Sequence, residues 1–292
     1  MIPPLVSFVT WIRMGLTIRN LTALLGTSDD FDLHIVDSNS MDGTWSYLQS
    51  LKDNRIKSVT KFDYNMGPVY ATNYNLSKRK RNQYFIAFDS DVNIHTKDWT
   101  GKFMEVFEAF PKVGLLGAVT KEYYDRYRLP LVKRENKDTY YLELCKGFVE
   151  GCCQCLRPEL LDILGYWSEE NCVGDMEISF RIQNCTSFKA GFLPAVEIDQ
   201  LQLVSCNECS GHKYCKLDHE ELNCFGIRDK KYQNPQFRTQ FSWKYRRFID
   251  EIRSGKREPY CASIHDEESM KNHYYNMQMA NENFDYYIKN AN

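Results

Sequence analysis

The sequence predicts an α/β fold, and three observations carry this prediction. Over about the first 200 of its 292 residues, short apolar runs typical of strands alternate with segments whose apolar residues recur at helical spacing. Apolar residues make up 43% of the chain, enough for a sizeable core in one large domain, alone or with a small appendage. No internal repeat or low-complexity tract breaks the alternation.

The predicted elements follow one another in strand and helix order. Apolar runs indicate strands at residues 5–10, 33–37, 84–88, 113–119 and 148–156. Helical spacing indicates helices at residues 16–25, 45–51, 68–80, 99–110 and 158–164. Pro158 in the first turn and Gly165 just past the end mark the limits of the last helix. The charged segment 121–146 is expected to form a loop beside a site.

The composition changes after about residue 200. A cysteine-rich stretch comes first, then a basic and aromatic stretch, then a polar stretch rich in tyrosine. Apolar spacing predicts helices at residues 241–252 and 267–288. We therefore expect residues 201–292 to form a Cys-rich and helical extension of a main domain over residues 1–200.

Charge and terminal composition narrow the choice of function and location. The net charge is −2, so the molecule as a whole carries no electrostatic footprint for nucleic acid. No apolar run of about 18 residues predicts a transmembrane segment, and the N-terminus lacks the features of a signal peptide. A cytoplasmic protein is expected, in which the 11 cysteines are thiols or metal ligands rather than disulfides.

Two carboxylates follow directly after the predicted strand 84–88. The strand runs into Asp89-Ser90-Asp91, and ligands bind at the carboxyl ends of strands in open α/β sheets. Two hard oxygen donors two residues apart suit Mg²⁺ or Mn²⁺, which complete their coordination with phosphate oxygens. The alternative is that Asp89 and Asp91 are ordinary turn residues. We interpret them as a divalent metal site.

Five segments, in order, resemble glycosyltransferase family 2. Residues 36–44, V-D-S-N-S-M-D-G-T, are similar to the family's V-D-x-x-S-x-D-G-T segment. Residues 65–73, N-M-G-P-V-Y-A-T-N, resemble its N-x-G-x-x-x-A-x-N helix start. The Asp-Ser-Asp segment follows, and then L-G-Y-W at 164–167. Residues 174–181, G-D-M-E-I-S-F-R, resemble the family's E-D-x-D-L-x-x-R block.

The resemblance implies a GT-A fold, in which a mixed sheet flanked by helices binds a nucleotide-diphospho-sugar. Thr10 and Asp37 would contact the nucleoside, and Asp37 would accept a hydrogen bond from the base. Asp89 would lie near the ribose and the metal, and Asp91 would ligate the metal. Asp175 would be the general base that deprotonates an acceptor hydroxyl.

The resemblance also implies that Arg181 lies in the donor site as a partner of the carboxylates. It divides the main domain into a donor half, about 1–120, and an acceptor half, about 121–200. Two positions have a simpler structural interpretation. Asp37 could end its strand and cap the next helix, and Asp175 could be the N-cap of a helix over residues 176–183.

A cysteine and histidine cluster begins the extension. Its spacing is C-x₂-C-x₂-H-x₂-C from Cys206 to Cys215, and zinc takes four such ligands in tetrahedral geometry. We predict a structural Zn²⁺ held by Cys206, Cys209 and Cys215, with His212 or Cys224 as the fourth ligand. Free thiols in a small core are the alternative.

Other histidines and cysteines have competing interpretations. The resemblance implies that a downstream histidine could complete the catalytic metal shell, and the candidates are His212, His219 and His265. Three cysteines fall on the strand pattern at 148–156 and are expected to be small buried hydrophobes: Cys152, Cys153 and Cys155.

Residues 228–257 are basic and aromatic. They contain ten Lys or Arg against three Asp or Glu, with six aromatic residues interleaved. Such a stretch could bind a nucleic acid, an anionic membrane surface or the diphosphate of a donor. The alternative is an amphipathic helix, 241–252, that docks on the core and leaves a solvated basic face.

An inverting, metal-dependent glycosyltransferase accounts for most of these features. It would use Mn²⁺ or Mg²⁺ and move a sugar from a nucleotide-sugar, with UDP favoured, to a hydroxyl group. The acceptor could be a glycan, a lipid-linked sugar, a protein or a modified DNA base. The alternatives are a zinc-stapled nucleic-acid-binding protein on the same scaffold and a sugar nucleotidyltransferase.

Overall fold

The structure, a computed structural model, describes residues 2–118, 120, 131–137, 140–171, 173–200 and 234–290. Its strands are β1 Leu5–Thr10, β2 Asp32–Asp37, β3 Ile56–Lys61, β4 Phe85–Asp89, β5 Val92–Ile94, β6 Val113–Gly117, β7 Leu131–Lys137, β8 Tyr140–Cys145, β9 Cys153–Leu156, β10 Lys189–Phe192 and β11 Ile198–Gln200. Its helices are α1 Met14–Leu25, α2 Thr44–Ser50, α3 Pro68–Leu76, α4 Trp99–Ala109, α6 Pro158–Leu164, α7 Gly174–Cys185, α9 Pro235–Arg253, α10 Glu267–Asn272 and α11 Met277–Lys289.

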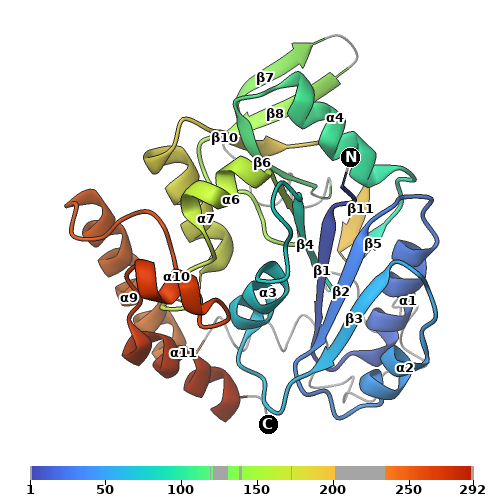
Figure 1. Ribbon diagram of the computed structural model, residues 1–292, viewed down its shortest axis with the longest axis horizontal. Coiled ribbons are helices and arrows are strands. Elements are labelled where there is room, and N and C mark those ends of the chain that lie inside the picture. Colours follow the sequence, from blue (N-terminus) through green and yellow to red (C-terminus); the bar gives the residue numbers. More distant parts are fainter. Residues whose placement is uncertain are drawn as a thin grey trace.

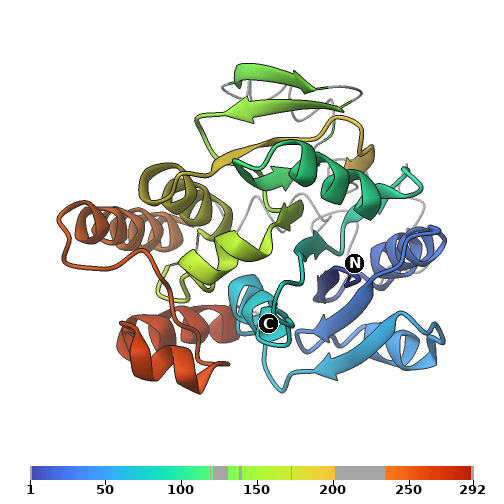
Figure 2. The ribbon, with the colours of Figure 1, turned by 45° about the horizontal axis from the view of Figure 1, so that its top comes forward.

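One large mixed sheet organises the described residues. Its nine strands lie in the order β3-β2-β1-β4-β9-β6-β10-β8-β7, and β5 and β11 form a separate antiparallel pair. Figure 1 and Figure 2 show α1 and α2 on one side of the sheet and α3, α6 and α7 on the other. The predicted α/β class is therefore confirmed.

Alternate side chains of the central strands supply two cores, one on each face of the sheet. In β4, Ile86 and Phe88 pack into a core with α1, α2 and α4, whereas Phe85 packs into a core with α3, α6 and α7. In β1, Phe8 and Leu5 divide between the same two cores. Because both faces are covered, these strands need apolar residues at nearly every position, which explains their uninterrupted apolar runs.

The parallel strands bring their carboxyl ends to one edge of the sheet. β1 runs parallel to β2 and β4, and β2 runs parallel to β3. The register pairs Thr10 with Asp37, and Val9 with Asp89. Residues that stand far apart in the sequence therefore meet at this edge.

The outer part of the sheet differs from the sequence prediction. The charged segment 121–146, expected as a loop, contains the antiparallel pair of β7 and β8. β7 is the edge strand of the sheet, where charged sequence is tolerated and discourages pairing with other chains. The strand expected at 148–156 begins only at Cys153, where it enters the sheet between β4 and β6.

The polar helix expected at 267–288 is two helices. The Asp266 side chain accepts hydrogen bonds from two backbone N–H groups at the start of α10, and the Asn276 side chain accepts one from Met279 at the start of α11. Each cap satisfies N–H groups that a continuous helix would have used, so the chain turns between the two helices.

Two adjacent carboxylates anchor the C-terminal helices to the main sheet domain. Glu169 accepts hydrogen bonds from the side-chain amide of Asn73 in α3, at 2.9 Å, and from the hydroxyl of Tyr275, at 2.6 Å. Glu170 forms an ion pair with Arg257. Both carboxylates are buried, so these contacts are shielded from water. The boundary predicted near residue 200 stays a prediction.

Candidate active site

Asp89 and Asp91 flank the turn between β4 and β5 at the carboxyl edge of the sheet. Asn20 of α1 donates from its side-chain amide to the carbonyl oxygen of Ser90 at 2.7 Å, which holds the turn. The N–H of Asp89 donates to the carbonyl oxygen of Cys152 at 2.9 Å. Asp91 is buried, whereas water reaches the side chain of Asp89.

Four carboxylates gather at this turn. The pKa of Asp89 is raised well above its usual range. The largest cause is desolvation of the carboxylate by the surrounding protein, and the charges of Asp91, Glu150 and Asp175 raise the pKa further. Arg13 opposes this effect. Because like charges this close repel one another, the cluster favours uptake of a proton or a cation. Glu150 was not singled out from the sequence, and it lies on the segment between β8 and β9.

Asp175 lies in the first turn of α7. A side chain on Gly151 would begin 3.5 Å from the Cβ of Asp175, so the glycine leaves space beside this carboxylate. Asp175 is not the N-cap: Val173 holds that position, and Asp175 accepts a hydrogen bond from the N–H of Met176 at 2.8 Å.

Arg13 faces the carboxylates from the segment between β1 and α1. Its guanidinium lies 3.5 Å from a carboxylate oxygen of Asp91. Both Ile12 and Arg13 have positive φ, of 49° and 62°, a conformation that costs free energy in non-glycine residues. The N–H of Ile12 donates to the hydroxyl of Ser40 at 2.7 Å, which helps to hold this backbone. Sequence reasoning missed Arg13, whose signal was its position just after the first strand.

Asp37 and Thr10 lie side by side at the ends of β2 and β1. Asp37 is fully buried, and one carboxylate oxygen accepts the N–H of Ser40 at 2.9 Å. Burial raises the pKa of Asp37. Its other oxygen has no hydrogen-bond partner among the described residues, so it could accept one from a ligand. The hydroxyl groups of Thr10 and Thr17 form a hydrogen bond of 2.7 Å. The helix after β2 is capped by Gly43, not by Asp37.

Arg181 is fully buried on the side of α7 away from water. Its guanidinium donates to both carboxylate oxygens of Glu177 and to the carbonyl oxygens of Leu164, Tyr166 and Pro259. These bonds use all five N–H donors of an arginine, so none is left for a donor phosphate. Its contacts favour a structural role over the predicted role in nucleotide-sugar binding.

The predicted zinc ligands lie outside the described residues: Cys206, Cys209, His212, Cys215 and Cys224. His219 lies there too. His265 is described, and its ring Nε2 donates a hydrogen bond to the carbonyl oxygen of Tyr70 in α3, at 3.1 Å, rather than to a carboxylate. The cysteines on and before β9 are buried thiols, as expected, and burial raises their pKa values.

The donor set at the β4–β5 turn suits a hard divalent cation. Within the described ranges, no three His, Cys, Asp or Glu side chains are placed to hold one metal ion together. Asp89 and Asp91 could therefore supply only part of a coordination shell. Mg²⁺ and Mn²⁺ commonly take the remainder from phosphate oxygens and water.

A mixed sheet flanked by helices, with acidic side chains at the carboxyl edge, defines the molecule as a GT-A type protein. The pattern of glycosyl transferase family 2 matches residues 13–165. The chain belongs to this family.

Solved structures that share the fold include the two that follow. The mannosyltransferase PcManGT from Pyrobaculum calidifontis, in complex with GDP-Man and Mn²⁺, has a TM-score of 0.52 and 18% identity over 66% of this chain and 55% of its own. GalNAc-T7, with UDP, GalNAc and Mn²⁺, has a TM-score of 0.52 and 13% identity over 87% of this chain and 58% of its own. The chain thus spans a little over half the length of these structures. No curated protein matches it.

One further finding concerns membranes. Among the helices that the structure describes, none is both long and apolar enough to cross a bilayer.

Proposed function

We propose that this protein transfers a sugar from a nucleotide-sugar to a hydroxyl acceptor, with inversion at the anomeric carbon. The observation that carries the proposal is that the segment Gly151–Cys152 lies between the two carboxylate positions: the N–H of Asp89 donates to the carbonyl oxygen of Cys152 at 2.9 Å, and a side chain on Gly151 would begin 3.5 Å from the Cβ of Asp175. Membership of glycosyl transferase family 2 supports the reaction class. The fold alone would not, because one fold hosts many activities.

The donor nucleoside would lie at the ends of β1 and β2. The buried oxygen of Asp37 that lacks a partner among the described residues would accept an N–H of the base. Thr10 would contact the nucleoside beside it. We favour a UDP-sugar, while the two solved structures carry GDP-Man in one case and UDP in the other.

Asp89 and Asp91 would hold Mn²⁺ or Mg²⁺. The acidic surroundings that raise the pKa of Asp89 favour such a cation, because its charge relieves the repulsion among the carboxylates. Bound there, the cation would supply Lewis-acid stabilisation of the departing diphosphate. The structures of PcManGT and GalNAc-T7 both contain Mn²⁺.

Asp175 would act as the general base. It would accept the proton of the acceptor hydroxyl as the oxygen attacks the anomeric carbon and the bond to the diphosphate breaks. A direct displacement of this kind inverts the configuration and needs no carboxylate nucleophile.

A thermal-shift panel of UDP-, GDP-, CMP- and dTDP-sugars, with and without Mn²⁺, tests the proposal. A ligand that binds only the folded state raises the melting temperature, so one nucleotide family should give a Mn²⁺-dependent shift. The Asp91→Ala variant should lose this shift, while the exposed-site variant Asp63→Asn should keep it. The absence of a shift with every donor, or full turnover by Asp91→Ala, would contradict the proposal.

A further inference from the structure

Arg13 is a cation beside the proposed metal site, and the proposed mechanism gives it no task. It lies between the end of β1 and the start of α1, and its Nη1 is 3.5 Å from a carboxylate oxygen of Asp91. Charge-assisted hydrogen bonds between an arginine and a carboxylate are usually about 2.7–2.9 Å long. The contact with Asp91 is therefore a loose ion pair. The Arg13 side chain is 19% exposed, so a ligand can reach it.

Most of the hydrogen-bonding capacity of Arg13 is unused within the described part of the chain. The contact with Asp91 is the single hydrogen bond of its guanidinium there, and its buried Nε has no partner there. Arg55, by contrast, donates to both carboxylate oxygens of Asp53 and to three backbone carbonyl groups. An arginine has five N–H donors, and a phosphate group can accept two of them at once. Arg13 therefore has donors to offer an anionic ligand, whereas Arg55 uses its donors for the fold.

The backbone on both sides of Arg13 is held by the segment that follows β2. Ile12 and Arg13 have positive φ values of 49° and 62°, which are unfavourable for residues with a Cβ atom. The N–H of Ile12 donates to the hydroxyl of Ser40 at 2.7 Å, and the N–H of Met14 donates to the carboxylate of Asp42 at 2.8 Å. Strained backbone that is held in this way is typical of ligand sites.

Arg13 lies between the two positions that the proposed function assigns to the donor. Thr10 shortly precedes it and pairs with Asp37 in the register of the sheet, where the nucleoside is proposed to lie. The contact with Asp91 places its guanidinium beside the proposed cation. Because the diphosphate connects the nucleoside to the sugar, it has to pass between these two positions.

We propose that Arg13 couples cation binding to donor binding: it pairs with Asp91 in the metal-free protein, and it binds the donor diphosphate once a divalent cation occupies Asp91. This inference rests on the proposed function. Cleavage at the anomeric carbon leaves the electron pair of the broken bond on the diphosphate, which gains negative charge. The guanidinium would stabilise that charge together with the cation, because both lie where the charge develops.

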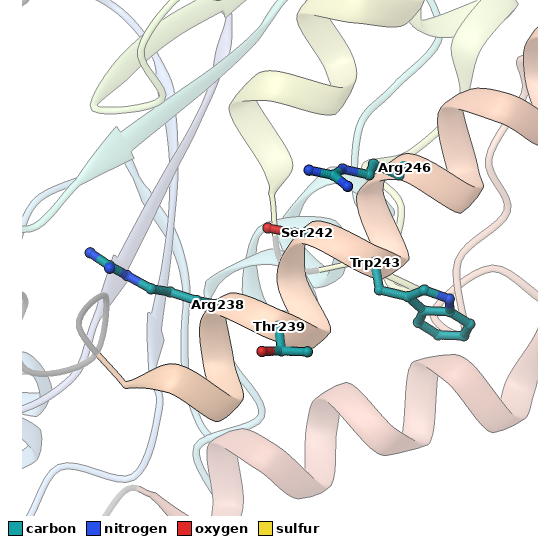
Figure 3. A pocket seen from close by; sticks show the side chains of 5 residues that line it. All are labelled: Arg238, Thr239, Ser242, Trp243 and Arg246. Atoms are coloured by element: carbon teal, nitrogen blue, oxygen red, sulfur yellow. The ribbon is translucent and has the colours of Figure 1, made fainter.

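The exposed arginines of α9 are a weaker candidate for binding the same anion. The expected amphipathic helix is present, and Phe248 and Ile249 bury its apolar side in a small core with Phe180 of α7. An open hollow of about 450 Å³ lies along its N-terminal half, lined by Arg238, Thr239, Ser242, Trp243 and Arg246. Figure 3 shows that all five side chains come from this one helix. The lining includes no residue of the β4–β5 turn, so this surface is a solvated basic face rather than part of the metal site.

Binding measurements on the full chain test the coupling without an assay of sugar transfer. The probes are Mn²⁺ alone, followed by electron paramagnetic resonance, and then UDP and GDP at saturating Mn²⁺. Arg13→Gln removes the charge and keeps a long polar side chain on the same backbone. The matched control, Arg81→Gln, removes the same charge from an exposed site before β4, at the opposite edge of the sheet.

The two kinds of probe should respond with opposite signs. Arg13→Gln should bind Mn²⁺ alone about threefold more tightly than the wild type, because the competing cation beside Asp91 is gone. At saturating Mn²⁺ it should bind UDP or GDP, whichever the wild type binds, about tenfold more weakly, because a charge-assisted contact is lost. Arg81→Gln should stay within about twofold of the wild type in both measurements.

The opposite signs separate this inference from a structural role, because a variant that merely distorted the turn would weaken the binding of both probes. Equal or weaker Mn²⁺ binding by Arg13→Gln would overturn the inference, and so would diphosphate binding equal to that of the wild type. Either result would leave the proposed function in place. A wild type that binds neither UDP nor GDP would contradict the proposed function itself, and the inference with it.

Discussion

The carboxylate of Asp89 lies among like charges. Its pKa is raised by the surrounding protein and by three neighbouring carboxylates, with Arg13 as the opposing cation. The fold brings these charges together because β4, the segment before β9 and the start of α7 converge at one edge. At the residue scale, repulsion among these carboxylates lowers the stability of the metal-free fold, and a bound cation would relieve it.

The first prediction concerns the stability cost of Asp89. Its pKa is higher in the folded than in the unfolded chain, so the folded state binds more protons and loses stability as the pH rises above about 4. Asp89→Asn removes this cost and should raise the metal-free melting temperature at pH 7. Thermal denaturation from pH 4 to pH 8 should show a gain that grows with pH. A gain that is independent of pH, or a loss of stability at pH 7, would contradict this.

The second prediction concerns Asp175. Asp175→Asn should bind the donor as the wild type does, because the side chain would act on the acceptor. Sugar transfer should fall by about 10²–10⁴-fold, the usual contribution of a general base. Steady-state kinetics with the thermal shift as a binding control would check this. A loss of less than about tenfold would remove Asp175 from the role of base.

At the scale of elements, the C-terminal helices hold the segment between α6 and α7 that leads to Asp175. Glu169 receives hydrogen bonds from Asn73 in α3 and from Tyr275 just before α11. Asn73 also donates to the carbonyl oxygen of Trp167 at 2.9 Å. Asn73, the second asparagine of the N-x-G-x-x-x-A-x-N segment, thus connects α3 to the segment that precedes the proposed base.

The third prediction tests this anchor. Tyr275→Phe removes the hydroxyl that bonds Glu169 at 2.6 Å and leaves a buried carboxylate oxygen with one partner fewer. The free energy of unfolding should fall by about 1–3 kcal/mol. Tyr274→Phe is the matched control, because Tyr274 is exposed, and it should change stability by less than about 0.5 kcal/mol. Urea unfolding of both variants measures the difference, and equal values would show that the bond to Glu169 contributes nothing.

At the scale of the whole molecule, buried polar contacts join the C-terminal helices to the sheet domain. Arg181 in α7 donates to the carbonyl oxygen of Pro259, and Glu170 pairs with Arg257. All three charged side chains are buried, so separating the two parts would leave charges without partners. The described C-terminal residues therefore belong energetically to the main domain.

The fourth prediction follows from this coupling. Calorimetry of the full chain should show one unfolding transition, with a calorimetric enthalpy equal to the van't Hoff enthalpy. Two separate transitions would mean that residues beyond about 200 unfold on their own, as an independent extension would. Arg257→Gln should lower the temperature of the single transition without splitting it.

Local sequence patterns were enough to predict several helices and strands and to single out some residues of the candidate site. The apolar runs of β1 and β4 and the Asp-Ser-Asp turn were found from the sequence, because a buried parallel strand must be apolar throughout. The strands β3, β5, β10 and β11 were missed, since short strands with mixed polarity carry little periodic signal. The loop expected at 121–146 was wrong where β7 and β8 form. β7 is an edge strand of mostly charged sequence, whereas β8 is an inner strand in which Leu142 and Leu144 are buried.

The sequence by itself determined the α/β class, and it singled out the family segments and the carboxylates Asp89, Asp91 and Asp175 as candidates, since each depends on residues close together in the chain. Only the tertiary structure decided what surrounds them. It placed Arg13 and Glu150 with the carboxylates, enclosed Arg181 in carbonyl groups and turned the basic start of α9 outward beside α7. These outcomes depend on contacts between residues that are tens or hundreds of positions apart in the sequence, and the local spacing of residue types does not reveal such contacts.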